Sequence, residues 1–162
     1  MIQYRIASER DAADIAALAR EVWTEHYAPL IGVQQVGYML EKFQSEPAIA
    51  AAIAETTAYH IAFDKETSVG YLALKPENDY LFLSKLYIRR DHRGMGIARG
   101  FFDIAAQTAR QMSLPAIRLT VNKGNADSIT IYRHTGFAIV MDVVADIGNG
   151  YVMDDYVMEW KL

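Results

Sequence analysis

The stretch from Leu81 to Asp103 constrains this chain more than any other, because it predicts a strand, a turn and a helix in direct succession. Residues 81–88 form an apolar run in which Lys85 is the only charge, as expected of a well buried strand. From Ile97 onward, apolar residues recur at the spacing of an α-helix. The helix is therefore expected to begin inside the loop Gly94-Met95-Gly96.

A helix that begins in a glycine loop offers a site for an anion. About four backbone N–H groups of the first turn have no partner within the helix, and the helix dipole places roughly half a positive charge there. Gly94 and Gly96 have no Cβ, so a ligand can approach these amides closely. Three neighbouring arginines, Arg89, Arg90 and Arg93, add positive charge. The loop therefore predicts a phosphate-binding site.

Two better known phosphate loops do not match. A dinucleotide-binding loop needs a third glycine in register and an acid about 20 residues later, whereas the stretch 114–118 contains no acid. A nucleoside-triphosphate loop needs Lys and then Ser or Thr after its glycines, whereas this chain has Ile97 and Ala98. Two alternatives stay open from the loop alone, a turn with no ligand and a nucleotide-binding domain of another kind.

The loop resembles the acetyl-CoA loop of the GNAT superfamily of N-acetyltransferases, whose pattern is Arg/Gln-x-x-Gly-x-Gly/Ala. The matching residues are Arg93-Gly94-Met95-Gly96-Ile97-Ala98. A second part of the family's pattern follows the next predicted strand, with Asn125, Tyr132 and Gly136-Phe137 at the family's spacing. Only Ser128 departs, where alanine is usual. More loosely, residues 23–32 resemble bacterial polyamine and small-amine acetyltransferases.

The resemblance implies that the chain uses acetyl-CoA as a co-substrate. The residues that it assigns to binding acetyl-CoA are Leu86, Tyr87, Ile88, Arg93, Gly94, Met95, Gly96, Ile97, Ala98, Asn125 and Ser128. The backbone of 86–88 would pair with the pantetheine arm and direct an amide at the thioester carbonyl, where it stabilises a developing oxyanion. A core strand and a helix cap would account for 86–88 and Asn125 equally well.

Tyr132 matches the family's general acid, which protonates the departing CoA thiolate. A phenol with an ordinary pKa of about 10 keeps its proton at neutral pH, as a proton donor must. The general base is not assigned, because the central strand carries Ser84 and Lys85 where several family members place a carboxylate. The other candidates, each expected to be a solvated charge, are Glu77, Asp79, Asp154, Asp155 and Glu159.

Acceptor contacts are predicted in residues 23–30, at Tyr38 and in the hairpin 145–156. The aromatic residues Trp23, Tyr27 and Tyr38 are the candidates, although ordinary core packing would explain them as well. The function that follows is N-acetylation of a primary amine in a small molecule or peptide, by direct attack in a ternary complex. The alternative is a CoA-binding sensor or interaction module that has lost catalysis.

Composition narrows the class of protein further. The chain contains no cysteine, which excludes an acyl-cysteine intermediate and a thiolate metal site. Its four histidines lack the spacing of a metal site, so no metal is expected. A net charge of −4 argues against binding nucleic acid and is compatible with a cationic acceptor. No apolar run approaches the ~18 residues of a membrane span, and no signal-peptide core follows the first residue, so we expect a cytoplasmic protein without a membrane partner.

The predicted elements form a single acetyltransferase domain of residues 1–162 with an α/β fold. Strands are expected at 2–6, 58–63, 68–74, 81–88, 114–122, 137–144 and 151–160, and helices from Ser8 to before Pro29 and at 33–46, 48–55, 97–113 and 125–135. The resemblance implies a mixed, mostly antiparallel sheet of six to seven strands, flanked by about four helices and splayed between its fourth and fifth strands. Exposed edges of the last strands favour a homodimer.

Helical spacing also predicts a core for the first half of the chain. The residues expected to be buried there are Ile15, Leu18, Ala19, Val22, Trp23, Met39, Leu40, Phe43, Ile49 and Ile53.

Overall fold

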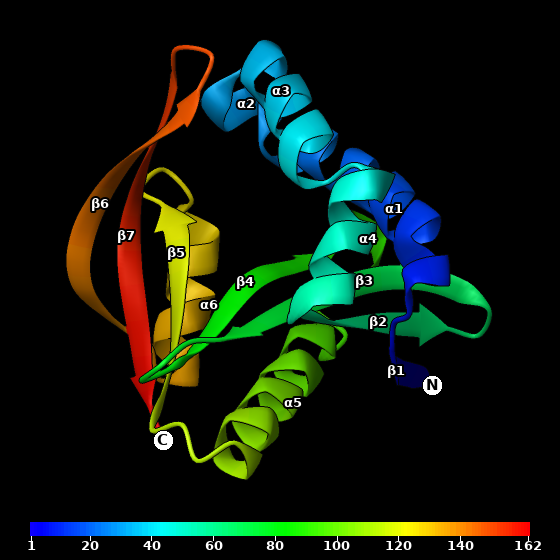
Figure 1. The fold of residues 1–162 in the computed structure, drawn as a ribbon, viewed down its shortest axis with the longest axis vertical. Coiled ribbons are helices and arrows are strands. Elements are labelled where there is room, and N and C mark those ends of the chain that lie inside the picture. The colour runs from blue at the N-terminus through cyan, green and yellow to red at the C-terminus, as the bar shows by residue number, and fades with distance from the viewer. The chain divides into compact units, whose positions relative to one another are not determined.

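In a computed structural model, which describes all residues 1–162, seven strands form one mixed sheet with six α-helices (Figure 1). The strands are β1 (Ile2–Ile6), β2 (Ala58–Asp64), β3 (Thr67–Pro76), β4 (Leu81–Ile88), β5 (Ala116–Asn122), β6 (Ala138–Gly148) and β7 (Tyr151–Lys161). The helices are α1 (Ala12–His26), α2 (Ala28–Ile31), α3 (Val33–Phe43), α4 (Glu46–Glu55), α5 (Ile97–Gln111) and α6 (Ala126–Thr135). Two short 3₁₀ turns are η1 (Glu9–Asp11) and η2 (Arg90–His92). None of the helices is both long and apolar enough to span a membrane.

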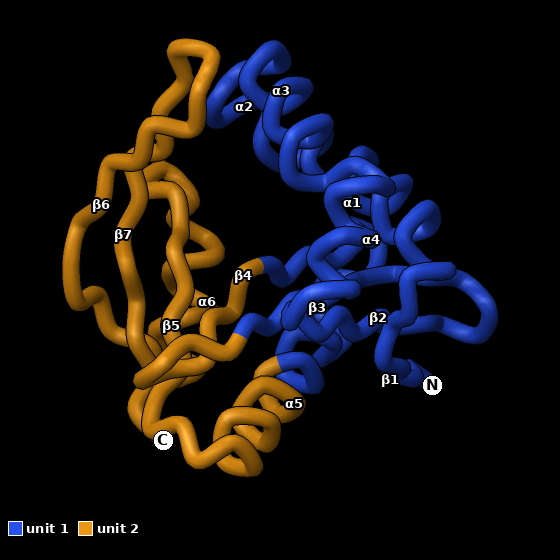
Figure 2. The backbone as a smooth tube through the Cα atoms, in the orientation of Figure 1, with its two compact units in different colours: residues 1–75, 85–101 blue, residues 76–84, 102–162 orange.

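The chain divides into two compact units (Figure 2). Unit 1 comprises residues 1–75 and 85–101, and unit 2 comprises residues 76–84 and 102–162. In unit 1, β2 pairs antiparallel with β1 and with β3. In unit 2, β4 pairs parallel with β5, while β7 pairs antiparallel with β5 and with β6. Because β4 runs through both units, the strand order is β1-β2-β3-β4-β5-β7-β6, which confirms the predicted mixed sheet.

The pairing of β4 with β5 is short. It covers two residue pairs, Leu81 with Ile117 and Phe82 with Arg118, although each strand is at least seven residues long. This brief parallel register agrees with the predicted splay between the fourth and fifth strands. The expected edge position of the last strands holds for β6 alone, because β7 lies between β5 and β6.

The core of unit 1 follows the predicted helical stripe. The backbone N–H of Ser8 donates to Asp11 Oδ2 at 2.8 Å, which fixes the start of the first helical segment at the residue where the sequence predicted it. The buried residues of α1 include all five predicted, Ile15, Leu18, Ala19, Val22 and Trp23. Strand β3 is buried on both faces from Val69 to Leu74, as its continuous run of apolar residues requires.

The helical region between α1 and β2 differs from the prediction in detail. Met39, Leu40 and Ile49 are buried, Ile53 is half-buried, and Phe43 is exposed while Gln44 is buried in its place. Phe43 is the last residue of α3, and the buried stripe of this helix ends before it, at Leu40.

The two prolines of this region lie inside helices. Pro47 occupies the first turn of α4, where its missing N–H has no helical partner to lose, so it begins the helix and does not break it. Pro29 lies in the first turn of the short helix α2, an element that was not expected from the sequence.

The last hairpin is longer and tighter than predicted. Residues 145–148 continue β6 where a loop was expected, because Ala145 pairs with Met153 and Asp146 with Val152. The chain reverses at Asn149 and Gly150, whose φ angles of 54° and 78° lie in the left-handed region that favours these residue types. The acceptor contacts predicted for 145–156 therefore fall on paired strands.

Gly136 closes α6 in a conformation that only glycine adopts without strain. Its φ is 128°, and a Cβ built there would lie 2.8 Å from Trp160 Nε1 of β7. The turn fixes Phe137, whose ring lies 5.7 Å from that of Trp160.

We expect Gly136→Ala to destabilise the fold by about 2 kcal/mol or more, because backbone strain and overpacking add. Urea unfolding would measure the change. Gly37→Ala is the matched control, since nothing lies within 4 Å of a Cβ at that position in α3, and it should leave stability unchanged or raise it. Equal stabilities of the two variants would contradict this account of Gly136.

Candidate active site

The predicted phosphate loop lies in unit 1, between β4 and α5. Gly94 and Gly96 have φ angles of 77° and 81°, and a Cβ built at either position would meet no atom within 4 Å. Ile88 before the loop and Ile97 after it are buried. The Tyr4 hydroxyl donates to the Ile97 carbonyl oxygen at 3.2 Å, which ties the start of α5 to β1. The loop backbone is thus held at both ends and open on its outer side.

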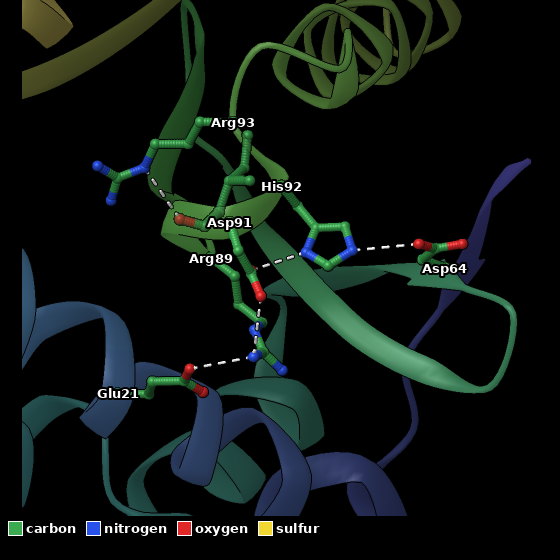
Figure 3. A network of polar contacts seen from close by, with 7 residues as sticks. Glu21, Asp64, Arg89, Asp91, His92 and Arg93 are labelled. Carbon is green, nitrogen blue, oxygen red and sulfur yellow. Dashed lines mark hydrogen bonds and ion pairs between the residues drawn. The ribbon is translucent and has the colours of Figure 1, made fainter.

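A polar network holds η2, immediately before the loop (Figure 3). His92 contacts Asp91 Oδ1 through Nδ1 at 2.8 Å and Asp64 Oδ2 through Nε2 at 3.1 Å. Asp64 ends β2, so this contact ties the chain before the loop to the β2–β3 hairpin. The two carboxylates, with Asp91 as the larger influence, raise the pKa of His92 above its ordinary value.

The arginines near the loop do not all serve it as predicted. Arg89 Nη2 lies 3.4 Å from Glu21 Oε1 and 3.3 Å from Asp91 Oδ2, so its charge is taken up by two carboxylates. Arg93 Nε donates to the Ile88 carbonyl oxygen at 3.3 Å (Figure 3). Arg90 is exposed. The positive charge that Arg89 was predicted to add is therefore partly neutralised by these two ion pairs, and backbone amides, Arg90 and Arg93 are the other groups that can meet an anion.

The second half of β4 carries a half-buried lysine. Lys85 Nζ donates to Tyr59 Oη at 2.6 Å and to the Phe43 carbonyl oxygen at 3.2 Å. Burial lowers the pKa of Lys85 to about 8 and raises that of Tyr59. The sequence offered no sign of this pairing, because Tyr59 and Phe43 lie on other elements. Lys85 is a hydrogen-bonded part of unit 1.

Aromatic side chains gather beside Lys85 in unit 1. The Tyr87 ring lies 5.4 Å from those of Trp23 and Tyr71 and 6.0 Å from that of Tyr27. Trp23 and Tyr27, two predicted acceptor contacts, are 4.5 Å apart. The third, Tyr38, accepts a hydrogen bond from Lys42 on its own helix at 3.2 Å. The structure thus brings Trp23, Tyr27 and Tyr87 together, while Leu86 beside them is half-buried.

Helix α6 carries the second part of the predicted site, in unit 2. Asn125 is buried and caps the helix by accepting a hydrogen bond from the Ser128 N–H at 3.4 Å. Tyr132 is half-buried, with its ring 6.0 Å from Phe102 and 5.8 Å from Phe137. These aromatic contacts fix the direction of the Tyr132 side chain.

The candidate carboxylates differ sharply in environment. Glu77 and Asp79 are exposed. Glu159 accepts from Arg118 at 2.7 Å, and Asp154 lies 3.0 Å from Lys123 Nζ. Asp155 is buried, and its Oδ1 has no hydrogen-bond partner. The expectation that Asp155 is a solvated charge is therefore wrong.

The residues of the loop fit the phosphates of a CoA substrate. Two left-handed glycines, separated by Met95 and placed just before a helix, leave open the space that a Cβ would fill, and the amides there can donate to phosphate oxygens. Elsewhere in the chain, the hydroxyl of half-buried Tyr132 and the buried carboxylate of Asp155 are groups that can transfer protons. No group of three or more metal-binding side chains comes together.

Comparison with known proteins places these features in a family. A family model described as the Acetyltransferase (GNAT) family matches residues 16–137. The PaiA N-acetyltransferase of Thermoplasma acidophilum, solved in complex with coenzyme A, superposes with a TM-score of 0.86 at 21% identity, covering 100% of this chain and 99% of that one. A GCN5-related N-acetyltransferase of Rhodopseudomonas palustris gives 0.84 at 19% identity, covering 99% and 95%. At these identities the two structures show the fold.

A curated sequence is similar over nearly its whole length. It is described as an uncharacterized N-acetyltransferase in the pepI 3′ region of Lactobacillus delbrueckii subsp. lactis. It is 22% identical over 152 residues, which cover 88% of this chain and 87% of that protein.

We expect the stability contributed by His92 to depend on pH. Because the folded pKa is raised above the ordinary 6.5, the contribution is fully present below that value and is lost as the pH rises through the folded pKa. Urea unfolding should show that His92→Gln destabilises the protein more at about pH 5.5 than at about pH 9. His134→Gln, at an exposed position of α6, is the control for the loss of a histidine outside this network. An equal effect of His92→Gln at both pH values would refute the ion-pair role.

Proposed function

Because this chain belongs to the Acetyltransferase (GNAT) family, we propose that it transfers the acetyl group of acetyl-CoA directly to a primary amine of a small molecule or peptide. The family makes it an acyltransferase with acetyl-CoA as co-substrate. The observation that carries the proposal is the open, left-handed loop at Gly94 and Gly96, which lies within the matched region. The coenzyme A bound to the PaiA N-acetyltransferase, which has the same fold, supports this assignment.

The phosphates of acetyl-CoA would bind the loop amides from residue 93 to residue 98. Backbone donors suit this task because they are fixed by the buried ends of the loop, so little conformational entropy is lost on binding. Arg93 also donates to the Ile88 carbonyl oxygen. It would therefore stabilise the loop conformation as well as attract the phosphates through its positive charge.

The backbone of Leu86, Tyr87 and Ile88 would hold the pantetheine arm and the thioester. An amide there would donate to the carbonyl oxygen as it gains negative charge, the interaction that typically contributes most to acyl transfer. The packing of the Tyr87 ring against Trp23 and Tyr71 holds this strand in place.

Transfer is proposed to be direct because the chain contains no cysteine to carry an acetyl group. The amine would attack the thioester while both substrates are bound, and Tyr132 would give its proton to the departing thiolate. Asn125 would cap α6 and contact the CoA arm beside Ser128. Acceptor contacts are proposed at Trp23, Tyr27 and Tyr38, of which the first two pack together.

We expect Gly96→Val to abolish or strongly weaken acetyl-CoA binding, because a branched side chain is strained at a φ of 81° and occupies the ligand's side of the loop. Isothermal titration calorimetry would measure the dissociation constant. Gly37→Val is the control, since a side chain there meets open space. The phosphate-site assignment fails if Gly96→Val binds acetyl-CoA as the wild type does.

We expect Tyr132→Phe to lower turnover by roughly 10²-fold or more while leaving acetyl-CoA affinity nearly unchanged, because it removes the proton donor alone. Free-thiol release from acetyl-CoA would be followed with polyamines, aminoglycosides, amino acids and short peptides as acceptors. The absence of cysteine removes any thiol background from the protein. Thiol release with one amine class would name the acceptor, and unchanged turnover of the variant would remove Tyr132 from the mechanism.

A further inference from the structure

Asp155 of β7 is a buried carboxylate with an unused acceptor. The residue is 8% exposed, and its Oδ1 atom is buried without a hydrogen-bond partner. Buried carboxylates are normally paired or hydrogen-bonded, since leaving one unpaired is costly. Burial, with a smaller contribution from the charge of Asp154, raises the pKa of Asp155 to about 6. A buried, unpaired carboxylate that the fold does not need for structure points to a ligand.

The position of Asp155 in unit 2 links it to the predicted catalytic helix. Asp155 lies directly opposite Asn122, the last residue of β5. Asn122 Oδ1 accepts from the Gly124 N–H at 2.8 Å and so shapes the loop that leads to the cap residue Asn125. The carboxylate therefore stands at the end of β5 from which α6 and Tyr132 begin.

The charged groups around Asp155 leave it without a counterion of its own. Lys123 follows β5, and its Nζ lies 3.0 Å from Asp154 Oδ1 and 3.2 Å from Asp142 Oδ2. The Lys123 charge lowers the pKa of Asp155 slightly but is shared by the two other carboxylates. Asp142 belongs to β6, where Val143 lies opposite Asp155. A cation arriving from outside is the missing partner.

Asp155 and α6 lie on opposite faces of the sheet in unit 2. Side chains alternate along β7, so Asp155 and Trp160, five residues apart in an unbroken register with β5, point to opposite faces. Trp160 contacts Phe137, and Phe137 contacts Tyr132, which places α6 on the Trp160 face. The proposed proton acceptor and the proposed proton donor therefore lie on opposite faces of the sheet in unit 2.

We propose that Asp155 is the catalytic general base of this chain, which binds the ammonium group of the acceptor through its unpaired oxygen and takes its proton. This assignment rests on the proposed acetyl transfer. It also predicts acceptors that are cationic at neutral pH, since a buried anion favours a cation as its partner.

The proton balance of the step is complete. The ammonium gives one proton to Asp155, and the neutral amine then forms a C–N bond to the acetyl carbon as the C–S bond breaks. The thiolate takes a proton from Tyr132, and the second proton of the attacking nitrogen restores the Tyr132 hydroxyl. Asp155 finally releases its proton to solvent, so acetyl-CoA and the ammonium yield the amide, CoA thiol and one proton.

The decisive experiment is the pH profile of kcat/KM for the most active amine of the panel, with wild type and Asp155→Asn. Wild-type activity should fall as the pH drops through about 6, because a protonated Asp155 accepts no proton. Asp155→Asn should lose about 10² in kcat/KM, more for strongly basic amines than for weakly basic ones, and should lack this acidic limb. Its dissociation constant for acetyl-CoA should equal that of the wild type.

Two neighbouring variants test the assignment through charge. Asp154→Asn removes a negative charge and should move the acidic limb to lower pH, whereas Lys123→Gln removes a positive charge and should move it to higher pH. A limb that stays in place in both variants, or one that persists in Asp155→Asn, would overturn the assignment.

A thermal unfolding series supplies a readout independent of turnover. Because the folded pKa of Asp155 is raised, its ionisation weakens folding increasingly as the pH rises from about 4 to about 6 and fully above that. The gain in melting temperature of Asp155→Asn over the wild type should therefore be larger at about pH 8 than at about pH 4. An equal gain at both pH values would contradict the conclusion that the carboxylate is unpaired. A wild-type protein that acetylates none of the amines would refute the proposed function and this assignment together. An Asp155→Asn variant as active as the wild type would refute this assignment alone.

Discussion

The left-handed backbone at Gly94 and Gly96 is the constraint on which the candidate site depends. Between buried Ile88, which ends β4, and buried Ile97, which begins α5, the chain passes through two glycines with positive φ, a conformation that other residues adopt only with strain. The brace from Arg93 to the Ile88 carbonyl oxygen and the bond from Tyr4 to Ile97 fix the two ends. The result is a set of backbone donors that are held in place before any ligand arrives.

Much of this fold was predictable because its signals are local. Strand β4, the start of α5 and both ends of α6 follow from apolar spacing, glycine and an Asn cap, each acting within a few residues. The predictions of element boundaries were wrong where one local sequence feature is compatible with two structures. A proline such as Pro47 breaks a helix interior but suits a first turn. The stretch Ala-Asp-Ile-Gly at 145–148 resembles a loop but continues an edge strand with one solvated face.

The site was predictable only in part, because burial and pairing are long-range properties. The glycine loop, Asn125 and Tyr132 were recognisable from their spacing. The engagement of Arg89 by Glu21 of α1 was not, since these residues are 68 positions apart in sequence. Asp155 follows Asp154 in sequence, yet strand alternation places one in solvent and the other inside. The alternation of side chains along β7 was the one sequence signal that could have predicted the burial of Asp155. Using it required knowing which face of the sheet is buried.

Burial acts on two charged side chains of the fold, half-buried Lys85 and buried Asp155, and only one of them has hydrogen-bond partners that compensate. Burial lowers the pKa of Lys85 to about 8 and raises that of Asp155 to about 6, so the folded protein disfavours the charged form of both side chains. Lys85 recovers stability through its bonds to Tyr59 and the Phe43 carbonyl oxygen. Asp155 Oδ1 has no such bond. Where a family often places a carboxylate on β4, this chain has a satisfied lysine, and its unsatisfied anion stands on β7. The general base proposed for this chain therefore lies on β7, while β4 carries Lys85 at its centre.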